Sequence, residues 1–463
     1  MSDVKLLSRQ YANRRNSHLA SRASVSLVIA IQALACSVGQ AQQTTSTWTG
    51  AISGTWQVNG NWYPGNQYPF WSGYVSKFSG AGNGNTVVSL GGLSVASANY
   101  NQIGLLFDTP SAASYFIGNG TLTFSQGGFP VRVNPSVVNN QVVTAVIVTD
   151  SQSINYTTEA VLNYSPVATL TLGNLTVVPG ASGTGSTVYN FRGLGDITVA
   201  GAITDNRSGA APRLTAVANH RAGTLVLSGV NEVSGSFSAS DTPQSISVGM
   251  GGTVVLDYTS GNTVLTNGTT VTPGRNGSGN LVLKGRATGT TSLTLSSTTR
   301  FGQGYSTITV DRNGGDGTTL VLGSDWRGWN SSGGGKMALF DLSSGGEVQV
   351  GGTIAGGYSI SRGIIRNSVG GSAVMVKGTD GKTYFATNNA SGYIVAQTDL
   401  ITMPTSGSGS FNDNYVVTAD TTLTGSGQFA GNTLRIEGTS ANQTLNLGGR
   451  NWNVAGAILM DGE

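Results

Sequence analysis

Few residues in this chain have the chemistry of a metal ligand or a catalytic nucleophile. The sequence contains one cysteine, Cys36, and two histidines, His18 and His220. A structural zinc ion takes four ligands, mostly Cys and His, so this composition argues against a zinc site. No Gly-x-Ser-x-Gly elbow accompanies His220, and we interpret it as a loop histidine that precedes a strand. We predict no catalytic residue, no metal ligand and no cofactor.

Carboxylates form the best alternative to this prediction. Polysaccharide lyases and hydrolases need two or three carboxylates, or a carboxylate with Arg or Lys, that converge on one face. The candidates are Asp205 with Arg207, and Asp311 with Asp316. The second pair has oxygen ligands spaced loosely like a calcium loop, but it lacks the later bidentate Glu. We interpret both segments as Asp/Asn/Gly turns, and the enzyme hypothesis stays open.

A second kind of candidate is an aromatic and basic loop. Trp326, Arg327 and Trp329 lie close together in a Gly/Ser-rich stretch. Two indoles and a guanidinium can stack on a sugar ring or on a partner surface. The indoles could equally fold back over the protein and shield a bulge. These three residues are the predicted ligand-binding candidates.

A repeat supplies the elements that would carry such residues. Residues 223–229, Gly-Thr-Leu-Val-Leu-Ser-Gly, are a short apolar run between two glycines, which is typical of a strand. Val226 is the centre of this copy, and the next centres fall at residues 255, 282, 321 and 349. Such irregular self-similarity predicts a solenoid with insertions, in which each unit covers the apolar face of its neighbour. The copies are residues 252–257, 279–285 and 317–323, with looser ones at 346–351 and 432–438.

The composition agrees with an all-β solenoid. The chain has 463 residues with 69 glycines, and only 10% of its residues are charged. Aliphatic residues recur too regularly among the glycines for a disordered chain, and glycine has no three-residue period as in collagen. No long stripe of period 3.6 is present beyond the first residues, so we expect almost no helix there.

Residues 223–237 resemble the repeat of the autotransporter-associated β-strand family. The first half keeps the Thr-Leu-x-Leu and Ser-Gly-x-Asn pattern, whereas Glu232-Val233 and Ser236-Phe237 depart from it. The resemblance implies a bacterial secreted or surface protein whose passenger is a right-handed parallel β-helix. The family shares no catalytic residues, so the resemblance implies no site.

The first 41 residues have the layout of a secretory signal peptide. A polar, positive segment is followed by an apolar one at 25–38 and by small residues before a cleavage position after Ala41. Twin-arginine export through Arg14-Arg15 and a lipoprotein box at Cys36 are open alternatives. The leader holds five basic residues and one acidic residue, which leaves 19 basic and 20 acidic residues beyond it and a net charge of −1. We therefore expect no nucleic-acid partner.

Beyond the signal peptide (1–41), we predict an N-terminal cap with the first coils (42–130) and a β-helix passenger (131–463), whose repeats are clearest at 222–350. Trp48, Trp56 and Trp62 are expected to form the aromatic cap, although exposed indoles could instead bind sugar rings. The C-terminal end resembles a coil in progress, so we expect a truncated chain without its anchor.

The resulting prediction is a non-enzymatic, secreted or cell-surface β-helix protein with a structural or adhesin-like role. The expected partners are extracellular glycans or other surface components. The expected contact with a membrane is limited to the export machinery or to a missing C-terminal anchor. The alternative is a β-helix that acts on or binds carbohydrate.

Overall fold

The computed structural model describes most of the chain from residue 44 onward. The chain divides into two units, residues 1–44 and 45–463, and only Thr44 of the first unit is described. The predicted signal helix and the cleavage position after Ala41 lie outside the described residues. The described residues are 44–64, 67–69, 74–92, 94–97, 103–125, 129–151, 156–179, 186–206, 214–219, 223–230, 246–275, 277–295, 300–301, 304–322, 327–328, 337–350, 360–361, 364–365, 372–437, 443–454 and 458–461.

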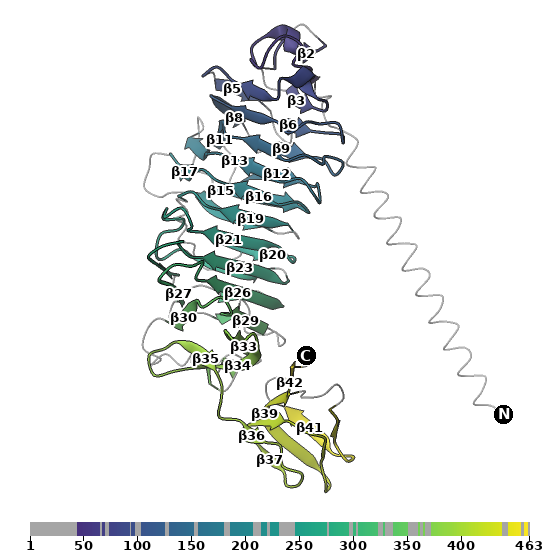
Figure 1. Ribbon diagram of the computed structural model, residues 1–463, viewed down its shortest axis with the longest axis vertical. Helices are drawn as coiled ribbons and strands as arrows, with labels where there is room; N and C mark the ends of the chain where they lie inside the picture. Colours follow the sequence, from purple (N-terminus) through teal and green to yellow (C-terminus); the bar gives the residue numbers. More distant parts are fainter. Residues whose placement is uncertain are drawn as a thin grey trace, which may run out of the picture. The chain divides into compact units, whose positions relative to one another are not determined.

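From β3 to β33 the chain winds into coils of up to three strands, and each strand of a coil lies on a different face (Figure 1). Face 1 holds the parallel strands β4 (Val87–Ser89), β7 (Phe116–Gly118), β10 (Gln141–Val143), β13 (Leu170–Leu172), β16 (Ile197–Val199), β19 (Thr224–Leu227), β21 (Thr253–Asp257), β23 (Gly279–Lys284), β26 (Tyr305–Asp311), β29 (Met337–Asp341) and β33 (Ser372–Lys377). The strands that follow them in each coil form face 2 and then face 3.

Face 2 consists of two separate parallel sheets. The first contains β5 (Ser94–Ser97), β8 (Thr121–Ser125), β11 (Val146–Ser151), β14 (Leu175–Pro179) and β17 (Ile203–Asp205), and the second contains β24 (Thr290–Thr294), β27 (Gly317–Leu322) and β30 (Glu347–Val350). Face 3 contains β3 (Tyr74–Phe78), β6 (Ile103–Phe107), β9 (Phe129–Val133), β12 (Tyr156–Asn163), β15 (Ser186–Gly193), β18 (Leu214–Asn219), β20 (Ile246–Gly249) and β22 (Val271–Arg275), and then the pair β25 (Arg300–Phe301) and β28 (Arg327–Gly328).

Alternation along each strand places one set of side chains inside the coil. Leu225, Val254 and Leu281 are in register on successive strands of face 1, and all three are buried. Burying one such aliphatic side chain contributes about 1.5–3 kcal/mol, and each depends on the next coil for its cover. The all-β parallel β-helix predicted from the sequence is confirmed, with about 11 turns.

The repeat centres do not all lie on one face. Val226, Val255 and residue 282 pair in register on face 1, as expected. The next partner on that ladder is Thr309 in β26, whereas Val321 lies in β27 on face 2 and pairs with Gln349. The apparent gap between 282 and 321 is therefore one coil plus a step to the next face.

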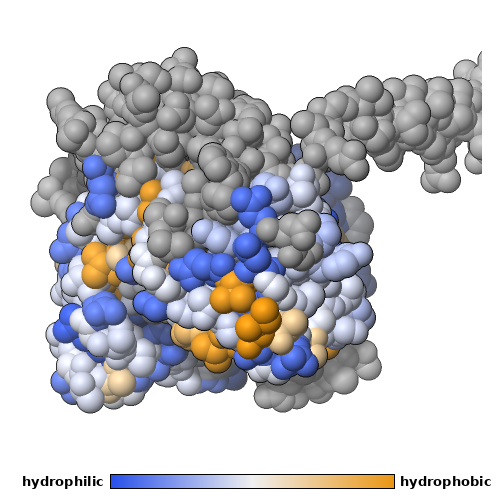
Figure 2. Space-filling model, turned by 90° about the horizontal axis from the view of Figure 1, so that it is seen from above, coloured by the Kyte–Doolittle hydropathy of each residue, from blue (hydrophilic) through white to orange (hydrophobic). Residues whose placement is uncertain are grey.

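An aromatic cluster covers the first coil. β1 (Thr44–Trp48) pairs antiparallel with β2 (Trp62–Tyr63), which follows the 3-10 turn η1 (Asn59–Asn61); a second such turn, η2 (Gly82–Gly84), precedes β4. Trp48, Trp56 and Trp62 are at most 2% exposed and pack against Phe78 with ring centroids 5.9–6.1 Å apart. The predicted cap is confirmed. The alternative of an exposed sugar platform at these indoles is wrong, because they are buried. Seen from this end, the described surface is mainly hydrophilic with small hydrophobic groups (Figure 2).

The described strands around the C-terminal end of face 1 include antiparallel pairs, whereas the sequence predicts one uninterrupted parallel column. β33 turns back into β34 (Thr383–Asn388), which pairs antiparallel with β35 (Ile394–Ala396). The turn contains Asp380-Gly381, and Gly381 has φ +77°, a conformation that favours glycine. The short strands β31 (Ile360–Ser361) and β32 (Ile364–Ile365) are also antiparallel, and β32 pairs with β33.

A second set of parallel strands follows. Its core is Met403, Tyr415, Val417, Leu423, Phe429 and Leu434. The strands are β36 (Ile401–Thr402), β37 (Gly409–Val417), β39 (Gln428–Glu437), β41 (Asn451–Val454) and β42 (Ile458–Asp461), with the separate pair β38 (Thr421–Thr422) and β40 (Leu445–Asn446).

Candidate functional site

The predicted ligand-binding loop is described only at one short strand. Trp326 and Trp329 lie outside the described residues. Arg327 belongs to β28, where its backbone pairs in register with Arg300 of β25. The role of this loop therefore stays a prediction.

The structure places the backbones of two of the candidate acidic residues on different faces and in different coils. Asp205 ends β17 on face 2, and Asp311 ends β26 on face 1. Their coils are four steps apart along the stack, which corresponds to roughly 19 Å at about 4.8 Å per parallel strand. Arg207 and His220 lie outside the described residues.

The segment from Asp311 to Asp316 is a structural turn, which confirms the interpretation made from its composition. The Asp311 carboxylate accepts a hydrogen bond from the backbone N–H of Asn313 at 2.8 Å. The Asn313 amide donates to the carbonyl of Gly285 in the preceding coil at 2.8 Å and to the Thr259 hydroxyl at 2.9 Å. The Asp316 backbone N–H donates to the carbonyl of Gly289 at 2.8 Å. Side chains that satisfy the backbone in this way hold neighbouring coils together.

Charged side chains at the strand ends also pair between coils. Lys284 Nζ lies 3.2 Å from Asp257 Oδ2, and the two residues are in register on face 1. Burial alone raises the pKa of Asp257, but hydrogen bonds from Thr259 and Lys284 outweigh it and leave the pKa below its ordinary value. Within the described ranges, no group of three or more His, Cys, Asp or Glu residues is arranged to hold a metal ion.

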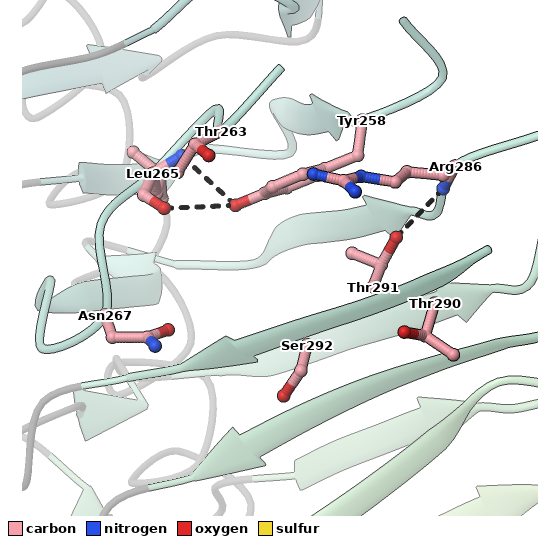
Figure 3. A pocket seen from close by; sticks show the side chains of 8 residues that line it. All are labelled: Tyr258, Thr263, Leu265, Asn267, Arg286, Thr290, Thr291 and Ser292. Carbon is pink, nitrogen blue, oxygen red and sulfur yellow. Dashed lines mark hydrogen bonds between the residues drawn. The ribbon is translucent and has the colours of Figure 1, made fainter. Parts of the chain in front are cut away.

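A pocket of about 250 Å³ lies beside these coils and was not predicted. Its lining comes from two neighbouring coils: Tyr258, Thr263, Leu265, Asn267, Arg286, Thr290, Thr291 and Ser292. Figure 3 shows Tyr258 and Arg286 on one side of the pocket, with Thr290, Ser292 and Asn267 on the other. The lining contains a guanidinium, four hydroxyl-bearing Thr and Ser residues and one carboxamide, but no carboxylate.

Hydrogen bonds hold the wall of this pocket. The Tyr258 hydroxyl accepts from the backbone N–H of Leu265 at 3.1 Å and lies 3.4 Å from the Leu265 carbonyl, to which it donates. Burial raises the pKa of Tyr258, so the hydroxyl stays neutral at physiological pH. The ring is 4% exposed and offers no open face for stacking.

Arg286 is the charged group of the pocket. Its Nη2 donates to the carbonyl of Gly261 at 3.0 Å, and its backbone N–H donates to the Thr291 hydroxyl at 2.9 Å. Its buried Nε–H has no hydrogen-bond acceptor among the described atoms. Sequence reasoning missed this residue because it stands alone after a repeat. The available signal was the long stretch from 258 to 270, which lacks the alternation expected for a face 2 strand.

The chain matches no known protein family, no curated protein and no solved structure. Among the described residues, no helix is long and apolar enough to cross a membrane. The identification of a function therefore depends on the residues and on the geometry above.

Proposed function

We propose that this chain is a non-enzymatic, secreted or cell-surface β-helix protein of a bacterium, related to the autotransporter-associated β-strand family, with a structural or adhesin-like role. The observation that carries the proposal is the parallel β-solenoid of about 11 turns. Its Asp311–Asp316 segment is occupied by turn and inter-coil contacts. The leader and the repeat at 223–237 support the surface location and the family.

Export is tested by expressing the full chain with its leader in a bacterial host. We expect the extracellular or surface form to begin at Gln42, as measured by mass spectrometry of its N-terminal peptide. Ala41→Tyr places a large side chain directly before the cleavage position and should retain the leader. Gln40→Asn, at the more tolerant neighbouring position, is the matched control. A chain that stays in the cytosol with residues 1–41 intact would refute the surface role.

The competing function is polysaccharide cleavage. It is tested with the purified full chain on a panel of acidic and neutral polysaccharides, with product release as the readout. We expect no release. Release that is lost in Asp311→Ala or Asp205→Ala, with the circular dichroism spectrum unchanged, would replace the proposed function by the enzymatic one.

A further inference from the structure

We propose that the pocket beside Arg286 binds the anionic group of an acidic sugar unit, either a carboxylate or a sulfate. This inference goes beyond the proposed function, because it holds whether or not the chain is exported. It depends on the described residues of two neighbouring coils and not on the loop at 326–329.

The positive charge of the pocket favours an anionic ligand. Arg286 supplies the charge of the pocket, and no described carboxylate forms an ion pair with it. Lys284, two residues before it, is paired with Asp257. A guanidinium presents donors in a planar fork that matches a carboxylate or a sulfate, and such charge-assisted hydrogen bonds are the stronger class.

The hydrogen bonding of Arg286 leaves donors for a ligand. A guanidinium has five N–H donors, and the contact with Gly261 uses one of them. The buried Nε–H has no acceptor among the described atoms, so its hydrogen bonding is incomplete in this arrangement. A small rotation of the Arg286 guanidinium toward an anion therefore breaks few existing hydrogen bonds and allows a bidentate contact with the anion.

The remaining lining favours a sugar over an apolar molecule. The exposed hydroxyl-bearing residues Thr290 and Ser292 and the amide-bearing Asn267 lie opposite Arg286 in Figure 3. Ligand sites for drug-sized molecules are mostly apolar and occupy about 300–1,000 Å³, whereas this pocket is polar and smaller, at about 250 Å³. Because the Tyr258 ring is buried, binding depends on hydrogen bonds and charge rather than on stacking.

The pocket lies where one coil has no named strand on face 2. Face 2 has strand β17 and, three coils later, strand β24, and in the coil directly before β24 the described residues 258–270 form no named strand. That segment meets the next coil by an isolated bridge from Thr269 to Leu295. The missing strand leaves a recess between this segment and β24, and a sugar of a longer chain can enter it from the side.

The test measures binding of defined oligosaccharides to the full chain by titration calorimetry at low salt. The probes are an oligogalacturonate, a sulfated oligosaccharide and a neutral glucan of equal length. We expect at least one acidic probe to bind at least tenfold more tightly than the glucan, with weaker binding at higher salt. The acidic probe that binds tells whether the anion is a carboxylate or a sulfate.

Variants test whether binding depends on this pocket or on the overall charge of the protein. Arg286→Gln should weaken acidic binding at least tenfold, and Thr290→Val with Ser292→Ala should weaken it without removing a contact of the wall. Arg312→Gln is the matched control, because Arg312 is exposed, bonds to the Gly315 carbonyl and lies outside the lining. Absence of binding to both acidic probes, equal binding of the glucan, or equal loss in Arg312→Gln would overturn the proposal. Failure here leaves the export result unaffected.

Discussion

The glycine that opens the repeat is the sharpest test of the stacking. Gly223 precedes β19 and Gly317 begins β27, so each opens its copy of the motif, three residues before the central Val226 in the first case and four before Val321 in the second. Their surroundings differ. A Cβ at Gly223 would lie 2.5 Å from the carbonyl oxygen of Gly195 in the preceding coil, whereas a Cβ at Gly317 would meet no atom within 4 Å. Replacing each glycine by alanine therefore shows whether glycine is required because two coils approach closely or only recurs because it begins the motif.

The cost at Gly223 follows from the spacing of the coils. Ordinary van der Waals contact begins near 3.4 Å, so the alanine methyl group overlaps the Gly195 oxygen by about 0.9 Å. Moving the coils apart by that amount would break the hydrogen bond from Thr224 N–H to Asp196 at 3.0 Å and the long one from Gly223 N–H to the Gly193 carbonyl at 3.3 Å. Overpacking and two weakened hydrogen bonds give a destabilisation of about 2–4 kcal/mol.

Urea denaturation followed by circular dichroism measures the overall loss, and hydrogen–deuterium exchange locates it. We expect faster exchange in β16 and β19 for Gly223→Ala, because solenoid coils depend mainly on their neighbours. Gly317→Ala should be neutral or stabilising by up to about 1 kcal/mol, since alanine restricts the unfolded chain. A Gly223→Ala protein within 0.5 kcal/mol of the parent, or equal effects of the two changes, would refute the close approach of these coils.

Two further predictions concern buried polar groups. Burial raises the pKa of Tyr115 to about 12, while an unfolded tyrosine ionises near 10. Its contribution is complete below pH 10 and is lost as the pH rises toward 12, by about 2–3 kcal/mol. Tyr115→Phe should reduce the loss of stability in urea curves over this range by that amount, while buried Tyr258 keeps its own contribution. Asn163 is buried, and its amide donates to the carbonyls of Ala168 at 2.8 Å and Asp196 at 2.9 Å. The Asn163 amide oxygen also accepts from the backbone N–H of Ser165 at 3.1 Å, while the Asp196 carbonyl has a second donor in the Leu170 N–H at 3.0 Å. Asn163→Ala should cost about 2–4 kcal/mol by removing the partners of the Ala168 carbonyl and the Ser165 N–H, whereas Asn174→Ala, at an exposed position, should cost less than 1 kcal/mol; equal losses would contradict this difference.

The sequence predicts the fold class well because the determining forces are local and repeated. The alternation around Val226 and Val255 decides which side chains face inward, and the parallel register follows when these faces stack. The strand of Thr309 is missed because Tyr305–Asp311 carries Ser306 where the clear copy opens with Gly279, and Thr309 in place of the central valine. Its inward residues, Ile308 and Val310, are buried nevertheless. Matching the motif in the sequence thus finds the clear copies of the repeat on either face. Only the pairing register of the strands shows to which face each copy belongs.

The turn after Lys377 was visible in the sequence as Asp380-Gly381, a pair that is typical of tight hairpins. Similar Asp/Asn/Gly groups elsewhere, such as the one at 311–316, connect parallel strands on different faces instead. Composition alone does not separate these two outcomes, because both need a residue with positive φ: Gly381 in one case and Asn313 in the other. The chain turns back when the next strand packs against the preceding strand. It continues to the next face when the apolar side chains of the next strand pack inside the same coil.

The pocket indicates where function can arise in such a fold. In a regular coil, most inward positions are filled by apolar side chains, and polar side chains after the strands bond to neighbouring coils, as Asn313 illustrates. The residues whose chemistry suggests a site are therefore already engaged in structural contacts. Where a coil lacks a strand, the replacement segment needs side chains to satisfy its backbone, and Tyr258 and Arg286 bond to Leu265 and Gly261 in this way. Arg286 has more donors than that task requires. A break in the alternation, more than a cluster of carboxylates, is thus the feature of the sequence that marks a candidate binding site in a parallel β-solenoid.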